Sequence, residues 1–366
     1  MNNFYMKKLI DGLKEENLDA MLICPSQELC LLTGYTPGMC ERFQGLFVKS
    51  SGEMFYFCNI IYKSEAEKNY KDEIPVYGWF DGDVMTEEIY KLLKKYDLCQ
   101  KKIAVNSSAP AFSVLDIAEK CGINFVNGKA LLENIRACKT HEELEDMRKA
   151  ASIADSAFCD VLSFIKAGMK EGEVSDFLHK HMEKDGGYGC WSIVASGPNS
   201  SYPHYAGRDR VIQKGDPIVI DFGCVYNGLC SDTSRTVFVG SVSDRFRELY
   251  NYVDESNRAG ETKAAEGVLC CDVDKAARDV LKKYGYDKTL INRVGHGIGR
   301  MIHEAPDIKA SNPTVLQKGM CFSIEPGIYI AGDVGMRIED IVCINENGET
   351  EVLNKSPRDL FVVDKD

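Results

Sequence analysis

The chain has 366 residues, of which 44% are hydrophobic and 27% charged, and its formal net charge is -12. This length permits two domains with buried cores. Because the sequence has no segment dense in lysine and arginine, we expect neither nucleic acid nor an anionic membrane as a partner. The sequence also lacks the ~20 consecutive apolar residues of a membrane span and the apolar core of a signal peptide. We therefore expect a cytoplasmic protein whose scattered cysteines are mostly reduced.

Short apolar strands alternate with helical patterns in the first part of the chain. Strands are predicted at residues 20–24, 102–106 and 123–127, and apolar residues at helical spacing predict helices around Leu92 and Ile117. This alternation is typical of an α/β domain. We predict that the first domain ends at residue 132.

A second domain, predicted over residues 133–366, begins with a helix start signal. Thr140 and Glu143 have the spacing of a capping box ahead of a long amphipathic helix. A helix over 173–184 and a strand-rich stretch follow. The same order then recurs, with two helices over 245–284 and strands to about residue 345.

The two halves of this second domain also resemble each other residue by residue. QKGDPIVIDFG (213–223) and QKGMCFSIEPG (317–327) align without gaps, and Asp221 falls on Glu325. Chance similarity of two strand starts is the alternative, but it does not account for the matching acids. We interpret the pattern as an internal duplication that gives an α+β domain of two helix-helix-sheet halves.

The first half contains a signal for a β-hairpin, the Asn-Gly pair at residues 227–228. If these two residues form the turn, Tyr226 pairs with Leu229. Asp221 and Asp232 then project from the same face of the hairpin, because side chains alternate faces along a strand. A three-residue loop would place the two aspartates on opposite faces.

The second half repeats this arrangement with glutamates. A turn centred on Gly332 places Glu325 and Glu339 opposite each other, where like charges are destabilising unless a positive charge lies between them. Arg337 is one candidate for that charge. Four carboxylates exceed what one arginine balances, so we predict divalent cations. The alternative is that the acids are separate, exposed or salt-bridged residues.

Three of the six histidines lie in loops rich in glycine or other turn formers. They are His204 in SGPNSSYPHY, His296 in VGHGIG and His303 in HEAPD. Loop histidines in such contexts are candidates for metal ligands or catalytic groups. The other three lie in charged helical sequence, and we expect them to be solvated.

The motifs IDFG, SDTSRT, GHGIG, HEAP, IEPGIYI and RIED, in this order and spacing, resemble the two-metal peptidases of the pita-bread fold. The N-terminal stretch LDAMLICPSQELCLLTGY resembles the creatinase-like domain of their Xaa-Pro branch, which includes prolidase and aminopeptidase P. The resemblance covers most of the chain. It implies a creatinase-like α/β domain followed by a pseudo-two-fold pita-bread catalytic domain.

Carried over position by position, the resemblance implies a set of five metal ligands: Asp221, Asp232, His296, Glu325 and Glu339. Glu325 is then also the catalytic general base, and His204 and His303 act on the substrate around the reacting peptide. Arg337 matches an arginine beside the last ligand and is expected to contact substrate. Arg300 is a minor departure, because relatives often carry an apolar residue there.

The implied reaction is hydrolysis of the peptide bond between an N-terminal residue and a following proline, with a hydroxide shared by two divalent ions as nucleophile. Oxygen-rich ligands favour manganese, with cobalt, zinc or iron as alternatives. The resemblance implies a homodimer acting on proline-containing peptides, and it does not separate a dipeptidase from an aminopeptidase. Two further hypotheses are a metal-dependent non-peptidase hydrolase or lyase of the same fold and a non-catalytic interaction protein.

Overall fold

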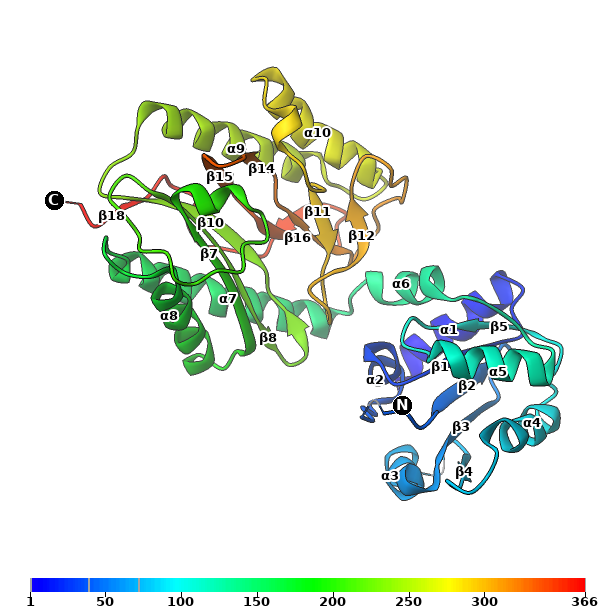
Figure 1. Cartoon of the computed structure of the whole chain (residues 1–366). Coiled ribbons are helices and arrows are strands. Elements are labelled where there is room, and N and C mark those ends of the chain that lie inside the picture. The colour runs from blue at the N-terminus through cyan, green and yellow to red at the C-terminus, as the bar shows by residue number, and fades with distance from the viewer. Residues whose placement is uncertain (1, 39, 72, 366) are drawn as a thin grey trace. The chain divides into compact units, whose positions relative to one another are not determined.

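The computed structural model describes residues 2–38, 40–71 and 73–365. The chain divides into two compact units, Met1–Arg136 and Ala137–Asp366 (Figure 1). Within the described part of the chain, none of the helices combines the length and the apolar character needed to cross a bilayer.

The first unit is built on a six-stranded sheet in the order β4-β3-β2-β1-β5-β6. Its strands are β1 (Ala20–Ile23), β2 (Gly45–Lys49), β3 (Met54–Asn59), β4 (Val76–Trp79), β5 (Lys102–Val105) and β6 (Asn124–Asn127). Its helices are α1 (Asn3–Glu15), α2 (Gln27–Thr33), α3 (Ile60–Tyr70), α4 (Met85–Lys95), α5 (Ala111–Cys121) and α6 (Lys129–Ala137), the last of which reaches the boundary between the units.

Both faces of this sheet are buried. Met21 and Ile23 of β1 belong to one apolar core, together with residues of α1, α2, α3 and α6. Ala20 and Leu22 belong to a second core, with residues of α4 and α5. Since successive strand residues point to opposite faces, helices cover both sides of the sheet. The predicted α/β architecture of this unit is confirmed.

The second unit begins with two helices and a sheet. They are α7 (His141–Phe164), α8 (Glu171–Lys184), β7 (Tyr188–Ser196), the short 3-10 helix η1 (Gly197–Ser201), β8 (Pro217–Tyr226), β9 (Leu229–Cys230) and β10 (Thr233–Val239). Helix α7 starts with the predicted capping box, in which the Thr140 and Glu143 side chains each accept a hydrogen bond from the other residue's backbone amide. The sheet has the order β18-β10-β8-β7, with β9 paired to β8.

The same order of elements then recurs. The second half contains α9 (Asp244–Lys263), α10 (Cys270–Lys283), η2 (Asp287–Thr289), β11 (Gly295–Gly297), β12 (Glu304–Ile308), β13 (Cys321–Ile324), β14 (Gly327–Ile330), β15 (Val334–Arg337), β16 (Asp340–Ile344), β17 (Thr350–Val352) and β18 (Val362–Val363). Its main sheet has the order β12-β11-β13-β16-β17, and β14 pairs with β15. β18 leaves this half and pairs with β10 of the first half.

Each half packs its helices against its own sheet. Residues of α7 and α8 share a core with β7, β8 and β10, including the stacked rings of Phe158 and Phe222. Residues of α9 and α10 share another core with β13 and β16. Figure 1 shows the two helix pairs on opposite sides of the paired sheets. The predicted duplicated helix-helix-sheet architecture is therefore confirmed.

Candidate metal centre

The first hairpin has the register predicted from its sequence. Tyr226 pairs with Leu229 at the end of β8 and β9. The two turn residues have positive φ angles, 47° at Asn227 and 82° at Gly228, as a two-residue type I′ turn requires. The Asn-Gly turn is confirmed, and it fixes which side chains share a face.

Asp221 and Asp232 lie on the same side of this hairpin. Asp221 is within β8, opposite Ser234 of β10, whereas Asp232 occupies the gap between β9 and β10. Both side chains line one cavity of about 520 Å³. The predicted same-face arrangement of the two aspartates is confirmed.

The second hairpin keeps one register across a break in both strands. β14 pairs with β15, and β13 pairs with β16, in a single register around the turn at Gly332. Glu325 falls between β13 and β14, and Glu339 falls between β15 and β16. The flanking pairs place these two glutamates opposite each other, as predicted, and both line the same cavity as the aspartates.

The backbone at both gaps is hydrogen-bonded to other parts of the domain. The amide of Glu325 donates to the carbonyl of Val294 (2.7 Å), and the amide of Glu339 donates to the carbonyl of Ser234 (3.0 Å). The Ser234 hydroxyl also donates to Oε2 of Glu339 (2.7 Å). Because Ser234 belongs to the first hairpin, these contacts join the two hairpins at their acidic residues.

His296 lies on β11 between two glycines whose backbones approach neighbouring strands closely. A Cβ at Gly295 would lie 1.9 Å from the carbonyl oxygen of Ser323, and one at Gly297 would lie 2.2 Å from the carbonyl carbon of Ala305. Larger residues therefore do not fit at either position. The close approach fixes the backbone of His296 against β12 and β13.

The surroundings of the His296 ring define which nitrogen faces the acids. Nδ1 lies 3.1 Å from the carbonyl oxygen of Gly297, which only accepts hydrogen bonds, so Nδ1 carries the proton. Nε2 lies 3.4 Å from Oε1 of Glu325 and 3.6 Å from Oδ2 of Asp232. Burial lowers the pKa of His296 to about 3. A neutral ring thus directs a lone pair at carboxylate oxygens.

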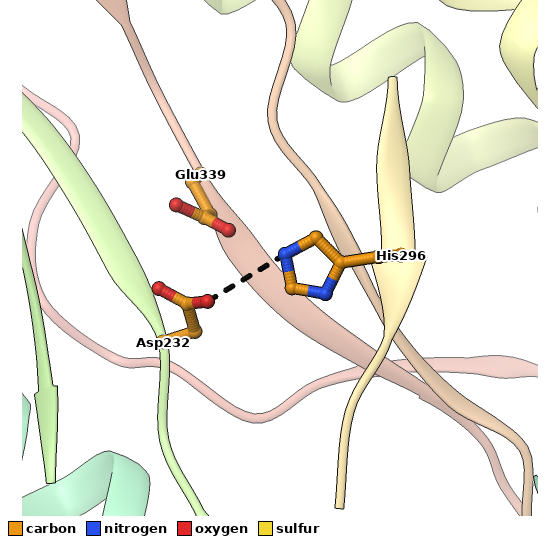
Figure 2. A group of neighbouring side chains, drawn as sticks. All are labelled: Asp232, His296 and Glu339. Atoms are coloured by element: carbon orange, nitrogen blue, oxygen red, sulfur yellow. Dashed lines mark ion pairs between the residues drawn. The ribbon is translucent and has the colours of Figure 1, made fainter. Parts of the chain in front are cut away.

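The residues present fit a divalent cation. Asp232, His296 and Glu339 each offer a ligand atom within 4.8 Å of the others, and Figure 2 shows their side chains converging from three separate segments of the chain. Among the described residues, Oδ1 of Asp221, Oδ1 of Asp232 and Oε1 of Glu339 are buried without a hydrogen-bond partner. Buried, unpaired carboxylate oxygens are costly, and a cation bound to them removes that cost.

Burial and mutual repulsion raise the pKa of three of these carboxyl groups. Burial is the largest cause for Asp232, followed by the charge of Glu339, and the pKa is raised well above the ordinary range. Burial and the charge of Glu325 do the same to Glu339. The pKa of Glu325 rises to about 7, mainly through burial. A bound cation favours the ionised form of each group.

Arg337 contacts the first hairpin. Its charge was one candidate to lie between Glu325 and Glu339, and its guanidinium makes an ion pair with Asp221. It also donates from Nε to the Ser234 hydroxyl (2.7 Å) and from Nη1 to the Tyr329 hydroxyl (2.9 Å). Arg337 therefore balances one aspartate of the first hairpin. Its charge also acts to lower the pKa of Glu325 and of Glu339, but one arginine does not balance four carboxylates.

The two remaining histidines lie at the open side of the cavity. His204 and His303 both line it and are exposed to solvent. The His303 ring meets the His296 ring edge to face at 4.2 Å between centroids. The next residue, Glu304, points into the interior and pairs with Lys139 at 2.5 Å, with both side chains buried. This buried ion pair holds the strand that begins next to His303.

Five further side chains line the cavity and were not predicted: Trp191, Ile193, Asn292, Arg293 and Ile302. Two of them lie on β7, the strand that pairs with the strand of Asp221. Ile193 lies opposite Asp221 on β7, and Trp191 is two residues away on the same strand face. The only sequence feature that marks Arg293 is its position close to the GHGIG motif. A single basic residue in a loop is weak evidence for a functional site.

Two family models match the chain. Metallopeptidase family M24 matches residues 145–346, and the creatinase/prolidase N-terminal domain matches residues 6–138. The chain therefore belongs to metallopeptidase family M24. The predicted family and fold class are confirmed, as is the prediction that the protein is a metallopeptidase.

Individual relatives cover nearly the whole chain. The Xaa-Pro dipeptidase of Pyrococcus furiosus is 32% identical over 361 residues, which span 97% of this chain and 99% of that protein. The crystal structure of dipeptidase PepE from Mycobacterium ulcerans has a TM-score of 0.93 at 31% identity, covering 98% of this chain and 97% of that one. For an X-Pro aminopeptidase from Thermotoga maritima the TM-score is 0.81 at 30% identity, with coverage of 98% and 99%.

Proposed function

We propose that this protein is an Xaa-Pro dipeptidase that uses two divalent ions, most favourably manganese. The observation that carries the proposal is the convergence of unpaired, buried carboxylate oxygens and the Nε2 lone pair of His296 on one cavity. Four carboxylates and one imidazole form an oxygen-rich donor set, which suits manganese better than a thiolate site would. Relatives named Xaa-Pro dipeptidase support the reaction.

The proposed ligands divide between two ions. Asp232 and Glu339 would be shared, Asp221 would complete one ion, and His296 with Glu325 would complete the other. The 3.4 Å separation of His296 Nε2 and Glu325 Oε1 supports this last pair. Arg337 is bonded to Oδ2 of Asp221, so the buried Oδ1, which has no hydrogen-bond partner in the described part of the chain, is the atom left for the first ion.

Divalent ions held by these five residues would supply Lewis-acid chemistry that makes a water acidic enough to lose a proton and attack the carbonyl carbon before proline. Glu325 is the proposed general base, which accepts that proton and passes it to the leaving imino nitrogen. His204 and His303, at the open side of the cavity, donate hydrogen bonds to the developing oxyanion or to the substrate's carboxyl end. Arg337 holds Asp221 and adds positive charge to the cavity wall.

Arg293 favours a dipeptide over a longer peptide. Its guanidinium lines the cavity and pairs with Asp307 at 2.7 Å, and the same carboxylate also pairs with Lys309 at 2.6 Å. Two cations share one carboxylate, so an excess positive charge remains at the rim of the cavity. The free carboxylate of a Xaa-Pro dipeptide is the group that would use it.

The assay that tests the function compares Ala-Pro with Ala-Pro-Ala in the presence of manganese. We expect Ala-Pro to be cleaved with the higher kcat/KM, and Arg293→Met to raise KM for Ala-Pro while leaving slow cleavage of Ala-Pro-Ala unchanged. Arg258→Met is the matched control, because it removes an arginine that is paired with one aspartate, Asp254, outside the cavity lining. Cleavage of neither peptide would reject the proposal.

The proposal also includes two properties of the whole protein. It would act as a homodimer, as the resemblance to the Xaa-Pro peptidases implies, and it would be located in the cytoplasm, as we expect from its sequence. Sedimentation equilibrium of the purified chain tests the dimer, and fractionation of cells that express it tests the location. Elemental analysis of protein loaded with manganese should give two ions per chain.

A further inference from the structure

The breaks in the second hairpin leave two backbone carbonyl groups to be bonded from outside the hairpin. Ile324 and Ile338 directly precede Glu325 and Glu339, at the points where the ladder stops. Both are fully buried. A buried carbonyl without a hydrogen bond destabilises the fold, so a donor must reach each of them.

A single side chain from helix α9 supplies both donors. The Asn257 amide nitrogen donates to the carbonyl of Ile324 at 2.7 Å and to the carbonyl of Ile338 at 3.3 Å. Asn257 is fully buried. One amide group therefore links Ile324 to Ile338, the residues that directly precede the two proposed glutamate ligands.

The orientation of this amide is determined by its second partner. Its oxygen, Oδ1, accepts a hydrogen bond from Nη1 of Arg358 at 2.8 Å. Since a guanidinium only donates, the oxygen of Asn257 must face Arg358 and the nitrogen must face the carbonyls. Arg358 is itself held by two hydrogen bonds to Glu261, one turn further along α9.

Close packing of α9 lets a short side chain reach the strands. A Cβ on Gly260 would lie 2.9 Å from Cγ2 of Ile324. Gly260 is one turn after Asn257 and on the same side of the helix. The absence of a side chain at Gly260 therefore brings the helix near β13, within the reach of the Asn257 amide.

A second buried group holds the Glu339 peptide from its other side. Arg235 of β10 is 1% exposed and donates from Nη1 to the carbonyls of Glu339 (2.6 Å) and Ser234 (2.9 Å). The Glu339 amide donates to the same Ser234 carbonyl. Arg235 therefore holds the backbone at Glu339 only. Asn257 instead donates to the carbonyl that precedes each of the two glutamates.

We propose that Asn257 is a positioning residue for the metal centre, which sets the separation and direction of Glu325 and Glu339 through the carbonyls that precede them. This inference rests on the proposed role of these glutamates as metal ligands. Groups that orient ligands without touching the metal change metal affinity by about 10- to 100-fold when they are replaced. Asn257 does not line the cavity, so substrate contacts do not account for such an effect.

Asn257→Asp tests the proposal, because it keeps the shape and replaces the donating nitrogen by an oxygen that faces two carbonyls. Asn257→Leu removes the donors without adding a charge. Ser256→Ala is the matched control: Ser256 is the neighbouring residue in α9, is fully buried, and donates to the carbonyl of Ala277 on α10 at 2.8 Å. The control therefore removes a buried hydrogen bond made by the same helix. This hydrogen bond does not involve the second hairpin.

The measurement is titration of each metal-free, full-length variant with manganese chloride alone, alongside circular dichroism and thermal unfolding. We expect both Asn257 variants to remain folded and to bind manganese about 10- to 100-fold more weakly, while Ser256→Ala binds as the parent does. Parent-like manganese affinity in both Asn257 variants overturns the inference, as does equal weakening in Ser256→Ala. If the parent itself binds no manganese, the proposed function fails first, which is a distinguishable result.

Discussion

The two acidic hairpins of the catalytic domain present their carboxylates by different means. In the first hairpin β8 runs without interruption from Pro217 to Tyr226, and only its partner strand is broken, at Asp232. In the second hairpin both strands are broken, at Glu325 and Glu339. The difference shows that a duplicated sequence pattern need not give a duplicated local geometry.

The broken hairpin depends more on the rest of the domain. At the breaks its backbone is bonded to Val294, Ser234 and the Asn257 side chain instead of to its own partner strand. The continuous strand of the first hairpin satisfies its backbone within the sheet. The two glutamates can therefore point toward one position. Their backbone then depends on hydrogen bonds from other parts of the domain.

The largest expected effect concerns the broken hairpin. Glu325→Gln keeps the size of the side chain but removes the proposed base, so kcat for Ala-Pro should fall by about 10²- to 10⁴-fold. Steady-state kinetics in saturating manganese measure this fall. Glu349→Gln, which changes an exposed acid of the same half, is the control and should leave kcat unchanged. A parent-like rate in Glu325→Gln would remove Glu325 from the mechanism.

The ion pair that links the hairpins gives the next largest effect. Arg337→Met leaves the buried Asp221 carboxylate without its cation, and breaking a buried pair in this way costs about 3–5 kcal/mol of unfolding free energy. Urea denaturation of the metal-free protein measures the loss. Arg245→Met is the matched control, because its pair with Asp333 at the turn of the second hairpin is half-exposed. We expect it to cost less than about 1 kcal/mol, and equal costs would contradict the distinction.

The pH dependence of stability should come chiefly from the broken hairpin. Folding raises the pKa of Glu325 from 4.5 to about 7, so the unfolded chain releases this proton at lower pH than the folded one. Stability of the metal-free protein should therefore fall as pH rises from about 4.5 to about 7. Melting temperatures between pH 4 and 8 measure the fall.

Bound metal should reverse this trend, because a cation favours the ionised carboxylates. The gain in melting temperature on adding manganese should grow from pH 5 to pH 8, and removing the ion with a chelator should restore the metal-free curve. Glu325→Gln should flatten the metal-free curve, since it removes one titrating group. An unchanged slope in this variant would assign the pH dependence to other residues.

The smallest effect is expected at the turns, where the two hairpins are alike. Gly228 and Gly332 have φ angles of 82° and 73°, which disfavour residues with a Cβ by about 1–2 kcal/mol. Gly228→Ala and Gly332→Ala should each lower unfolding free energy by about that amount and leave manganese binding intact. Loss of metal binding in either variant would show that the turn, and not the break, directs the acids.

The sequence by itself determined the two-domain fold class, the duplication and both hairpin registers. Local signals were sufficient there, since side-chain alternation and the Asn-Gly turn fix which residues share a face. Motif order was also sufficient for the family. The sequence likewise supplied the candidate ligands Asp221, Asp232, Glu325 and Glu339 together with His296, whose side chains the structure brings to one cavity.

Only the tertiary structure decided which groups support these residues. Arg337, one candidate for the charge between the glutamates, pairs with Asp221, because the first hairpin lies against the second at Ser234 and Glu339. Asn257 and Arg293 belong to no motif, and their roles arise from contacts far apart in sequence. Periodicity and turn signals describe neighbours along the chain, whereas these hydrogen bonds depend on how helices and hairpins pack together.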